Sequence, residues 1–137
     1  MDRRLHWSHK HVFEADPVSM GKVRAFVGAH LVEHVDRPLV ADLQLVASEL
    51  ATNALTHTGT PFTVALEQDG PCVRLTVSDG APSVPVRRRA AGDLDETGRG
   101  LAIVETLSSE WGVTVGSDGC KSVWASFDSE VLGRRAG

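Results

Sequence analysis

Two pairs of strand-like runs, each joined by a short turn, constrain the fold more than any other feature of this sequence. Residues 62–68 (FTVALEQ) and 72–79 (CVRLTVSD) alternate between apolar and polar side chains, and the Asp-Gly step at 69–70 between them is typical of a β-hairpin. The second pair comprises residues 111–117 (WGVTVGS) and 120–127 (CKSVWASF), again with Asp-Gly at the turn. Because strands joined by short turns lie antiparallel, we expect a mixed, mostly antiparallel sheet.

Three segments carry helix signals, and the N-terminal run 4–14 alternates like a further strand. The first helix is expected over 16–35, since its Asp-Pro step suits a helix start. Its apolar stripe comprises Val18, Val23, Phe26, Val27, Leu31 and Val35. A second helix is expected over 39–57 and a third over 100–109. These helices must bury their apolar stripes on the sheet, which predicts an α/β (α+β) two-layer sandwich with the helices on one face.

Length and composition point to one globular domain, residues 1–137, because 42% of the residues are hydrophobic and 23% are charged. No apolar run approaches the length of a membrane span, and the N-terminal MDRRLHWSHK has no signal-peptide core. We therefore expect a cytoplasmic protein with no membrane partner. The net charge of -4 argues against direct nucleic-acid binding, although Arg87, Arg88 and Arg89 form a local basic patch.

The cysteines and the N-terminal histidines have ordinary explanations. Cys72 and Cys120 fall in predicted strands without metal-ligand spacing, so we expect small buried thiols. His6, His9 and His11 lie in a strand-like run. A solvated strand face explains them better than metal binding or phosphoacceptance.

Glu49, Asn53 and His57 follow one another at four-residue intervals within the second predicted helix, and Asp42 extends this polar row. At about 100° per residue the row lies beside the apolar stripe and not within it. That stripe comprises Leu43, Val46, Ala47, Leu50 and Ala54. The row either lines a cleft beside the core or is a solvated flank whose end charges suit the helix dipole.

Two further clusters can also be explained either by ligand binding or by local structure alone. Asp79 ends an apolar strand, where its carboxylate could accept a hydrogen bond from an exocyclic amine or simply begin an Asp-Gly turn. In 97–107 (TGRGLAIVETL), Gly98 and Gly100 open an apolar helix. The free N–H groups of a first helical turn can hold a phosphate, and Arg99 could add a charge-assisted contact. Alternatively, Gly98 and Gly100 only provide the backbone flexibility that a junction between a loop and a helix needs.

Together and in this order, the three clusters resemble motifs of the GHKL ATPase family, whose nucleotide site is the Bergerat fold. Residues 49–53 (ELATN) resemble its N box, 79–81 (DGA) stand where its first glycine box stands, and 98–101 (GRGL) resemble its second. The resemblance extends from about residue 17 to 128 and makes residues 80–99 the ATP lid. It implies ATP and Mg²⁺ as cofactors.

The resemblance also implies a role for each residue. Glu49 would be the general base for the attacking hydroxyl, Asn53 would hold Mg²⁺ at the ATP phosphates, and Asp79 would bind the adenine amino group. The other cofactor-binding positions would be His57, Ala81, Gly98, Arg99, Gly100 and Leu101.

Within the family, the size and motifs look closest to the anti-sigma-factor serine/threonine kinases and to the short regulatory ATP-binding proteins of actinomycetes. This implies an ATP-dependent kinase that phosphorylates an anti-anti-sigma antagonist protein and also sequesters a sigma factor. Related kinases often form homodimers through their N-terminal region. Trp7, Val12 and Phe13 would supply apolar contacts there, or they pack within the monomer.

One departure from the family leaves a second function open. The first glycine box usually reads Asp-x-Gly-x-Gly, whereas residues 79–83 read DGAPS. A non-catalytic ATPase-like module that holds a partner protein, with or without nucleotide, is therefore the alternative. The catalytic domain of a sensor histidine kinase fits less well, because the sequence has no membrane segment and no room for a phosphoacceptor helix pair.

Overall fold

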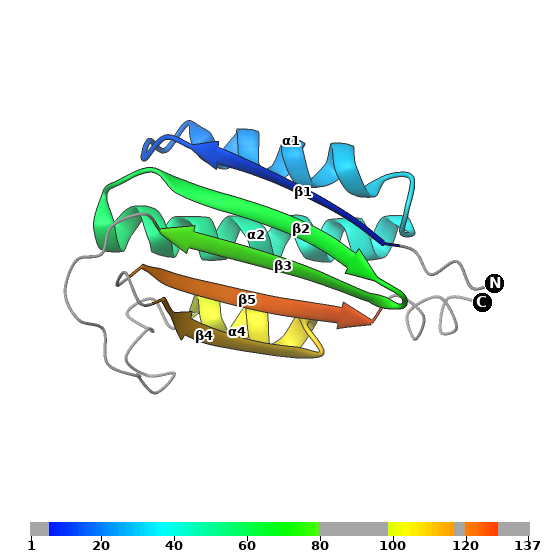
Figure 1. The fold of residues 1–137 in the computed structure, drawn as a ribbon. Coiled ribbons are helices and arrows are strands. Elements are labelled where there is room, and N and C mark those ends of the chain that lie inside the picture. Colours follow the sequence, from blue (N-terminus) through cyan, green and yellow to red (C-terminus); the bar gives the residue numbers. More distant parts are fainter. Residues whose placement is uncertain (1–5, 80–98, 117–119, 129–137) are drawn as a thin grey trace.

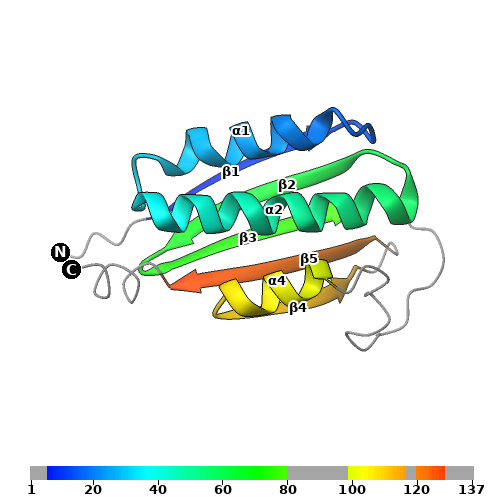
Figure 2. The ribbon, with the colours of Figure 1, turned by 180° about the vertical axis from the view of Figure 1, so that it is seen from behind.

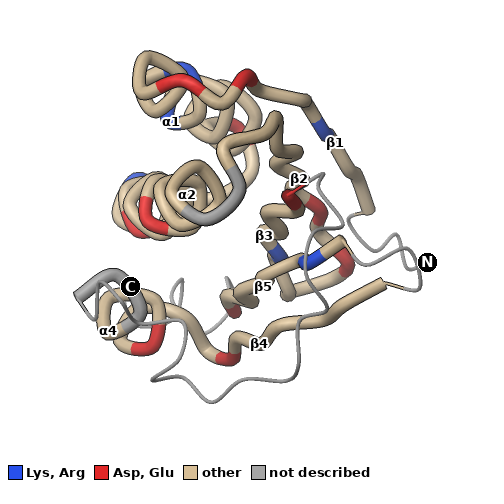
Figure 3. Tube along the Cα trace, turned by 90° about the vertical axis from the view of Figure 1, so that its left-hand side faces the viewer, with Lys and Arg blue, Asp and Glu red and all other residues tan. Residues whose placement is uncertain are grey.

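The computed structural model describes residues 6–79, 99–116 and 120–128, which form an antiparallel sheet covered by helices on one face (Figures 1 and 2). The strands are β1 (His6–Phe13), β2 (Phe62–Asp69), β3 (Cys72–Asp79), β4 (Glu110–Val115) and β5 (Lys121–Asp128). The helices are α1 (Ser19–Leu31), α2 (Arg37–Thr58) and α4 (Arg99–Leu107). Figure 3 shows the two layers end on and confirms the predicted sandwich.

The sheet has the order β1-β2-β3-β5-β4, and every neighbouring pair is antiparallel. Both expected strand pairs form, and the Gly70 φ of 66° suits the tight turn between β2 and β3. The strands of the second pair do not follow the first pair in chain order. β5 pairs with β3, so β4 forms the edge of the sheet. Helix α4 lies between β3 and β4 in the chain.

The core lies between the sheet and the helices and follows from the alternation along each strand. In β2 and β3 every second side chain is buried, including Phe62, Leu66, Leu75 and Val77. The predicted stripe of α2 is buried as well, with Leu43, Val46 and Ala47 at 0% exposure, Leu50 at 1% and Ala54 at 6%. This burial is the main favourable contribution to folding, at about 25 cal/mol per Å² of apolar area.

Helix α1 is shorter than predicted at both ends. The Oδ1 of Asp16 accepts a hydrogen bond from the Val18 backbone N–H at 3.0 Å, which closes a turn before the helix and delays its start to Ser19. Val18 consequently lies outside the stripe and is 62% exposed, so its predicted burial was wrong. The helix ends at Leu31, and turn residues lead to Pro38 at the start of α2. None of the described helices has an apolar stretch long enough to cross a membrane.

The prediction that both cysteines are buried was wrong for Cys72, which is exposed, while Cys120 is partly buried. Cys72 is the first residue of β3 and belongs to the set of alternate positions that faces away from the helices. On that same face the Arg74 guanidinium lies 4.2 Å from the centre of the Trp124 ring. A Cβ on Gly112 would lie 2.7 Å from this indole, so glycine makes the close packing of β4 on β5 possible.

The N-terminal apolar residues pack mostly within the monomer. Phe13 is 5% exposed in the core, and the Trp7 indole N–H donates to Gln68 at 2.9 Å. Val12 points the other way and is 60% exposed. The prediction of solvated histidines holds for His6 and His11, which are exposed, but was wrong for His9, which is partly buried beneath α1.

Candidate nucleotide site

Helix α2 presents a different chemistry on each of three flanks. The apolar stripe faces the sheet. A second flank faces α1, where the Gln44 amide donates to the Arg24 carbonyl at 2.9 Å and the Thr52 hydroxyl lies 3.5 Å from the Met20 sulfur. The polar row that contains Glu49 and Asn53 lies on the opposite flank from α1, since Glu49 and Asn53 are about 140° and about 180° away from Gln44 on a helical wheel of about 100° per residue.

The polar row is neither core nor solvated surface. Asp42, Glu49 and Asn53 are all partly buried, between the fully buried stripe and the exposed Leu45 at 42%. Helix α4 packs on the same side of α2, away from α1 (Figure 2). The row therefore lies on the flank of α2 that faces α4.

Asp79 is the last residue of β3 and faces the helices, because it continues the alternation of the buried Val73, Leu75 and Val77. Its exposure is only 4%, and its Oδ1 has no hydrogen-bond partner in the described structure. A buried carboxylate oxygen without a partner is costly, and such an atom needs an explanation. A ligand that donates a hydrogen bond would satisfy it.

Ser48 carries the other buried oxygen without a partner among the described residues. It lies between Gln44 and Thr52 on the flank of α2 that faces α1, and so away from Asp79. We have no physical account of this hydroxyl, and it takes no part in the candidate site.

The sheet topology brings the separate motifs to one end of the molecule. Phe62 begins β2 directly after α2 and pairs with Asp79 at the end of β3. The start of α4 and the start of β5 lie at that same end (Figures 1 and 2). The C-terminal half of α2, the end of β3 and the first turn of α4 thus meet, although they are far apart in the sequence.

Asn53 and Asp79 line one cavity at this end. Its walls come from α2, β3 and β5, and the lining residues are Leu50, Asn53, Ala54, Val77, Asp79, Lys121 and Val123. The cavity volume is about 10 Å³, which is the room of a single water-sized group. A ligand would therefore insert only an edge here, such as an exocyclic amine, and would extend toward α4.

The structure places the other predicted site residues as follows. Glu49 lies one helical turn before Asn53 on the same flank but does not line the cavity. His57 lies in the last turn of α2, and Arg99, Gly100 and Leu101 form the first turn of α4; the described structure does not extend to these four side chains. Ala81 and Gly98 lie outside the described residues.

Lys121 is a cavity residue that the sequence analysis missed. It begins β5, and continuing the register from Ser78 opposite Ser122 sets it across from Asp79. The signal that could have found it is the pairing of β5 with β3. Sequence patterns predict each hairpin but not the contact between two hairpins, so they did not indicate that this lysine lies at the cavity.

A larger hollow of about 260 Å³ lies on the opposite face of the sheet, near the turn between β2 and β3. Its lining residues are His6, Glu67, Gln68, Asp69, Cys72 and Arg74. None of them belongs to the three motifs, and the face lies outside the layer formed by the helices. We therefore base the functional assignment on the smaller cavity, where the buried, unsatisfied carboxylate lies.

Comparison with known proteins shows the family and the fold of the chain. A family model for the histidine kinase-like ATPase domain matches residues 13–127. No curated protein matches the chain. A solved structure, that of the RsbU and RsbW domains of Rv1364c from Mycobacterium tuberculosis, is similar with a TM-score of 0.67 and 24% identity. The match covers 89% of this chain and 32% of that chain, so this chain spans about a third of that one.

Proposed function

Because the chain belongs to the histidine kinase-like ATPase domain family, we propose that it is an ATP- and Mg²⁺-binding anti-sigma factor that phosphorylates a serine or threonine of an antagonist protein. The observation that carries the nucleotide site is the buried Asp79 Oδ1 without a partner, at the edge of a cavity shared with Asn53. The similarity to a structure that includes an RsbW domain supports the choice of regulatory class.

The residues suit the adenine end of ATP. A carboxylate accepts hydrogen bonds and does not donate them, so Asp79 would select the exocyclic amine of adenine. The 6-oxo group of guanine presents an acceptor at that position, which the carboxylate repels. The apolar walls from Leu50, Val77 and Val123 would pack against the base.

At the phosphate end, the first turn of α4 would direct its free N–H groups at the phosphates. Asn53 would hold Mg²⁺, which supplies charge neutralisation at the phosphates. Glu49 would take the proton from the attacking hydroxyl of the partner protein. The hydroxyl oxygen then forms its bond to the γ-phosphorus as the bond to the β-phosphate oxygen breaks, and ADP leaves.

Nucleotide binding by purified protein tests this proposal. We expect ATP with Mg²⁺ to raise the melting temperature of the wild type, because a ligand specific for the native state stabilises it, and GTP to have a much smaller effect. Asp79→Asn should lose most of the ATP effect, since its amide adds a donor facing the adenine amine. Asp69→Asn, the same change at an exposed position of β2, is the matched control and should keep the full response.

The absence of any shift of the wild type at millimolar ATP would rule out the kinase. The second candidate function, a non-catalytic module that sequesters a partner, would then stand. Residues 79–83 (DGAPS) favour it, because they lack the later glycines of the first glycine box. An intact ATP response in Asp79→Asn would instead remove Asp79 from the base-binding role.

A further inference from the structure

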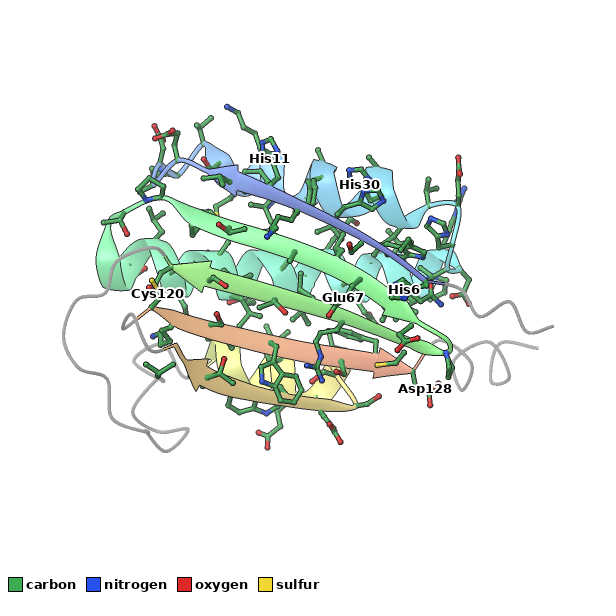
Figure 4. All side chains as sticks on the ribbon, in the orientation of Figure 1. His6, His11, His30, Glu67, Cys120 and Asp128 are labelled. Atoms are coloured by element: carbon green, nitrogen blue, oxygen red, sulfur yellow. The ribbon has the colours of Figure 1, made fainter. Side chains whose placement is uncertain are left out.

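Strand β1 and helix α1 are joined by a series of aromatic and imidazole rings that the nucleotide site does not use. The α1-facing positions of β1 are Trp7, His9, His11 and Phe13, and each has a ring partner on α1 or on the turn after it. The contacts are Trp7–His34 at 4.6 Å, His9–His30 at 3.9 Å, His11–Phe26 at 5.9 Å and Phe13–Phe26 at 5.8 Å between ring centroids. Figure 4 labels His11 and His30 along this seam.

The closest contact joins two histidines. His9 and His30 stack at an interplanar angle of 25°, and His30 also meets Phe26 edge to face at 4.8 Å. Stacked imidazoles attract when neutral, whereas two imidazolium rings at this distance repel. The stack presents ring faces to each other, and no group of three His, Cys, Asp or Glu in the described residues is arranged to hold a metal ion. A proton-dependent role therefore fits the pair better than metal binding.

The contacts found for His30 in the described residues bring no negative charge to it. Its ring partners are Phe26 from α1 and His9 from β1, and His34 from the turn after α1 acts on its pKa. On the neighbouring helix α2, the side chain of Gln44, which is neutral, contacts α1. The charged groups His6, Lys10 and Glu67 occupy the alternate strand positions that face away from the helices, and Glu33 is exposed after α1.

All the effects found on the pKa of His30 lower it. Burial lowers the pKa of His30 from 6.5, and the nearby charges of His9 and then His34 lower it further. A group whose pKa is lower when packed than when free stabilises the packed state above the free value. The packed state is thus fully favoured above about pH 6.5 and loses stability as the pH falls through that value.

We propose that the His9–His30 stack is a proton-operated latch, which holds the edge strand β1 to helix α1 while His30 is neutral and releases it when His30 becomes protonated. In the described structure β1 is an edge strand that pairs only with β2, so its helix-facing contacts are what the latch controls. Release would free β1 and α1 to move, without requiring the rest of the sheet to unfold.

Hydrogen exchange on the full chain tests the latch without nucleotide. Protection factors, corrected for the intrinsic effect of pH, would be measured for the β1 amides between pH 7.5 and 5. In the wild type we expect their protection to fall several-fold relative to the β3 amides as the pH drops. In His30→Phe the ring contact remains but the charge cannot form, so the fall should disappear. His6→Phe, the same change on the opposite face of the same strand, is the matched control and should retain it.

A wild type whose β1 protection is constant over this range would overturn the proposal, and so would His30→Phe with an unchanged fall. His30→Gln gives a second comparison if the phenylalanine variant does not fold. It lacks both charge and ring, so it should show weak but pH-independent protection. Because no nucleotide is present, these outcomes are independent of whether the proposed kinase function is correct.

Discussion

Asp79 and Glu49 show how much a single side chain contributes to the site. Leaving one buried acceptor without a partner costs about 1–3 kcal/mol, so the fold carries an energetic cost at Asp79 that a bound base would recover. Glu49 is different, because it is partly buried on the flank of α2 and does not line the cavity. Its proposed task concerns the hydroxyl of a partner protein and not the recognition of the base.

Replacing Glu49 therefore separates chemistry from binding. In Glu49→Ala we expect transfer of the γ-phosphate to fall by at least about 100-fold, as for loss of a general base, while ATP binding stays near the wild-type level. Radiolabelled ATP measures transfer to candidate antagonist proteins, and titration calorimetry measures binding. Glu67→Ala, at an exposed position on the far face of the sheet, should leave both unchanged. Wild-type transfer by Glu49→Ala would exclude Glu49 as the base.

At the scale of elements, α2 is the organising helix. Its 22 residues pack on the sheet, on α1 and on α4, while one flank carries the polar row. The αL conformation of Gly59, with φ of 67°, ends the helix and turns the chain into β2. The register of the apolar stripe thereby sets where Asn53 stands relative to Asp79. A helix rotated by one residue would bury the polar row instead.

Two leucines of α2, two positions apart, test the role of the stripe. Leu43→Ala removes a side chain with 0% exposure and should lower the free energy of unfolding by about 2–5 kcal/mol. Leu45→Ala, at 42% exposure, should cost less than about 1 kcal/mol. Urea denaturation followed by circular dichroism measures both. Equal losses for the two variants would contradict the packing described for α2.

At the scale of the whole molecule, the sheet is open, and its strands differ in the number of strands to which they are hydrogen-bonded. β3 is bonded on both sides and buried by α2, whereas β1 and β4 each have one bonded neighbour in the described structure. The cavity lined by Asn53 and Asp79 lies at the end of the central strand β3, and the His9–His30 stack lies at an edge of the sheet. The candidate site thus lies beside a strand with two hydrogen-bonded neighbours in the described sheet, and the proposed latch lies beside a strand with one.

This arrangement predicts the order of local stability. At pH 7.5 the amides of β3 should exchange most slowly, with free energies of opening near that of global unfolding, and those of β4 and β1 should exchange faster. Residue-resolved hydrogen exchange by NMR measures this order. The Leu75 and Val77 amides serve as internal references, since these residues are 0% and 3% exposed. Uniform exchange across all five strands would mean that the sheet opens only as one unit.

The sequence alone determined the local features of this protein. The alternation in the strands, the Asp-Gly turns, the stripe of α2 and the order of the three motifs depend on neighbours within a few residues of one another. They predicted the two-layer sandwich, and the resemblance of the three motifs to the GHKL family implied a nucleotide site that includes Asn53 and Asp79. The start of α1 was predicted too early in the chain, because the Asp16 side chain closes a turn that competes with the helix start.

Only the tertiary structure decided how distant segments meet. It placed β5 beside β3, which brings Lys121 to the cavity, and it packed His9 against His30 instead of exposing it to solvent. It also turned Cys72 outward at the start of β3. Each result depends on long-range packing, which sequence periodicity does not encode, since a pattern assigns a side chain to a face but does not specify what covers that face.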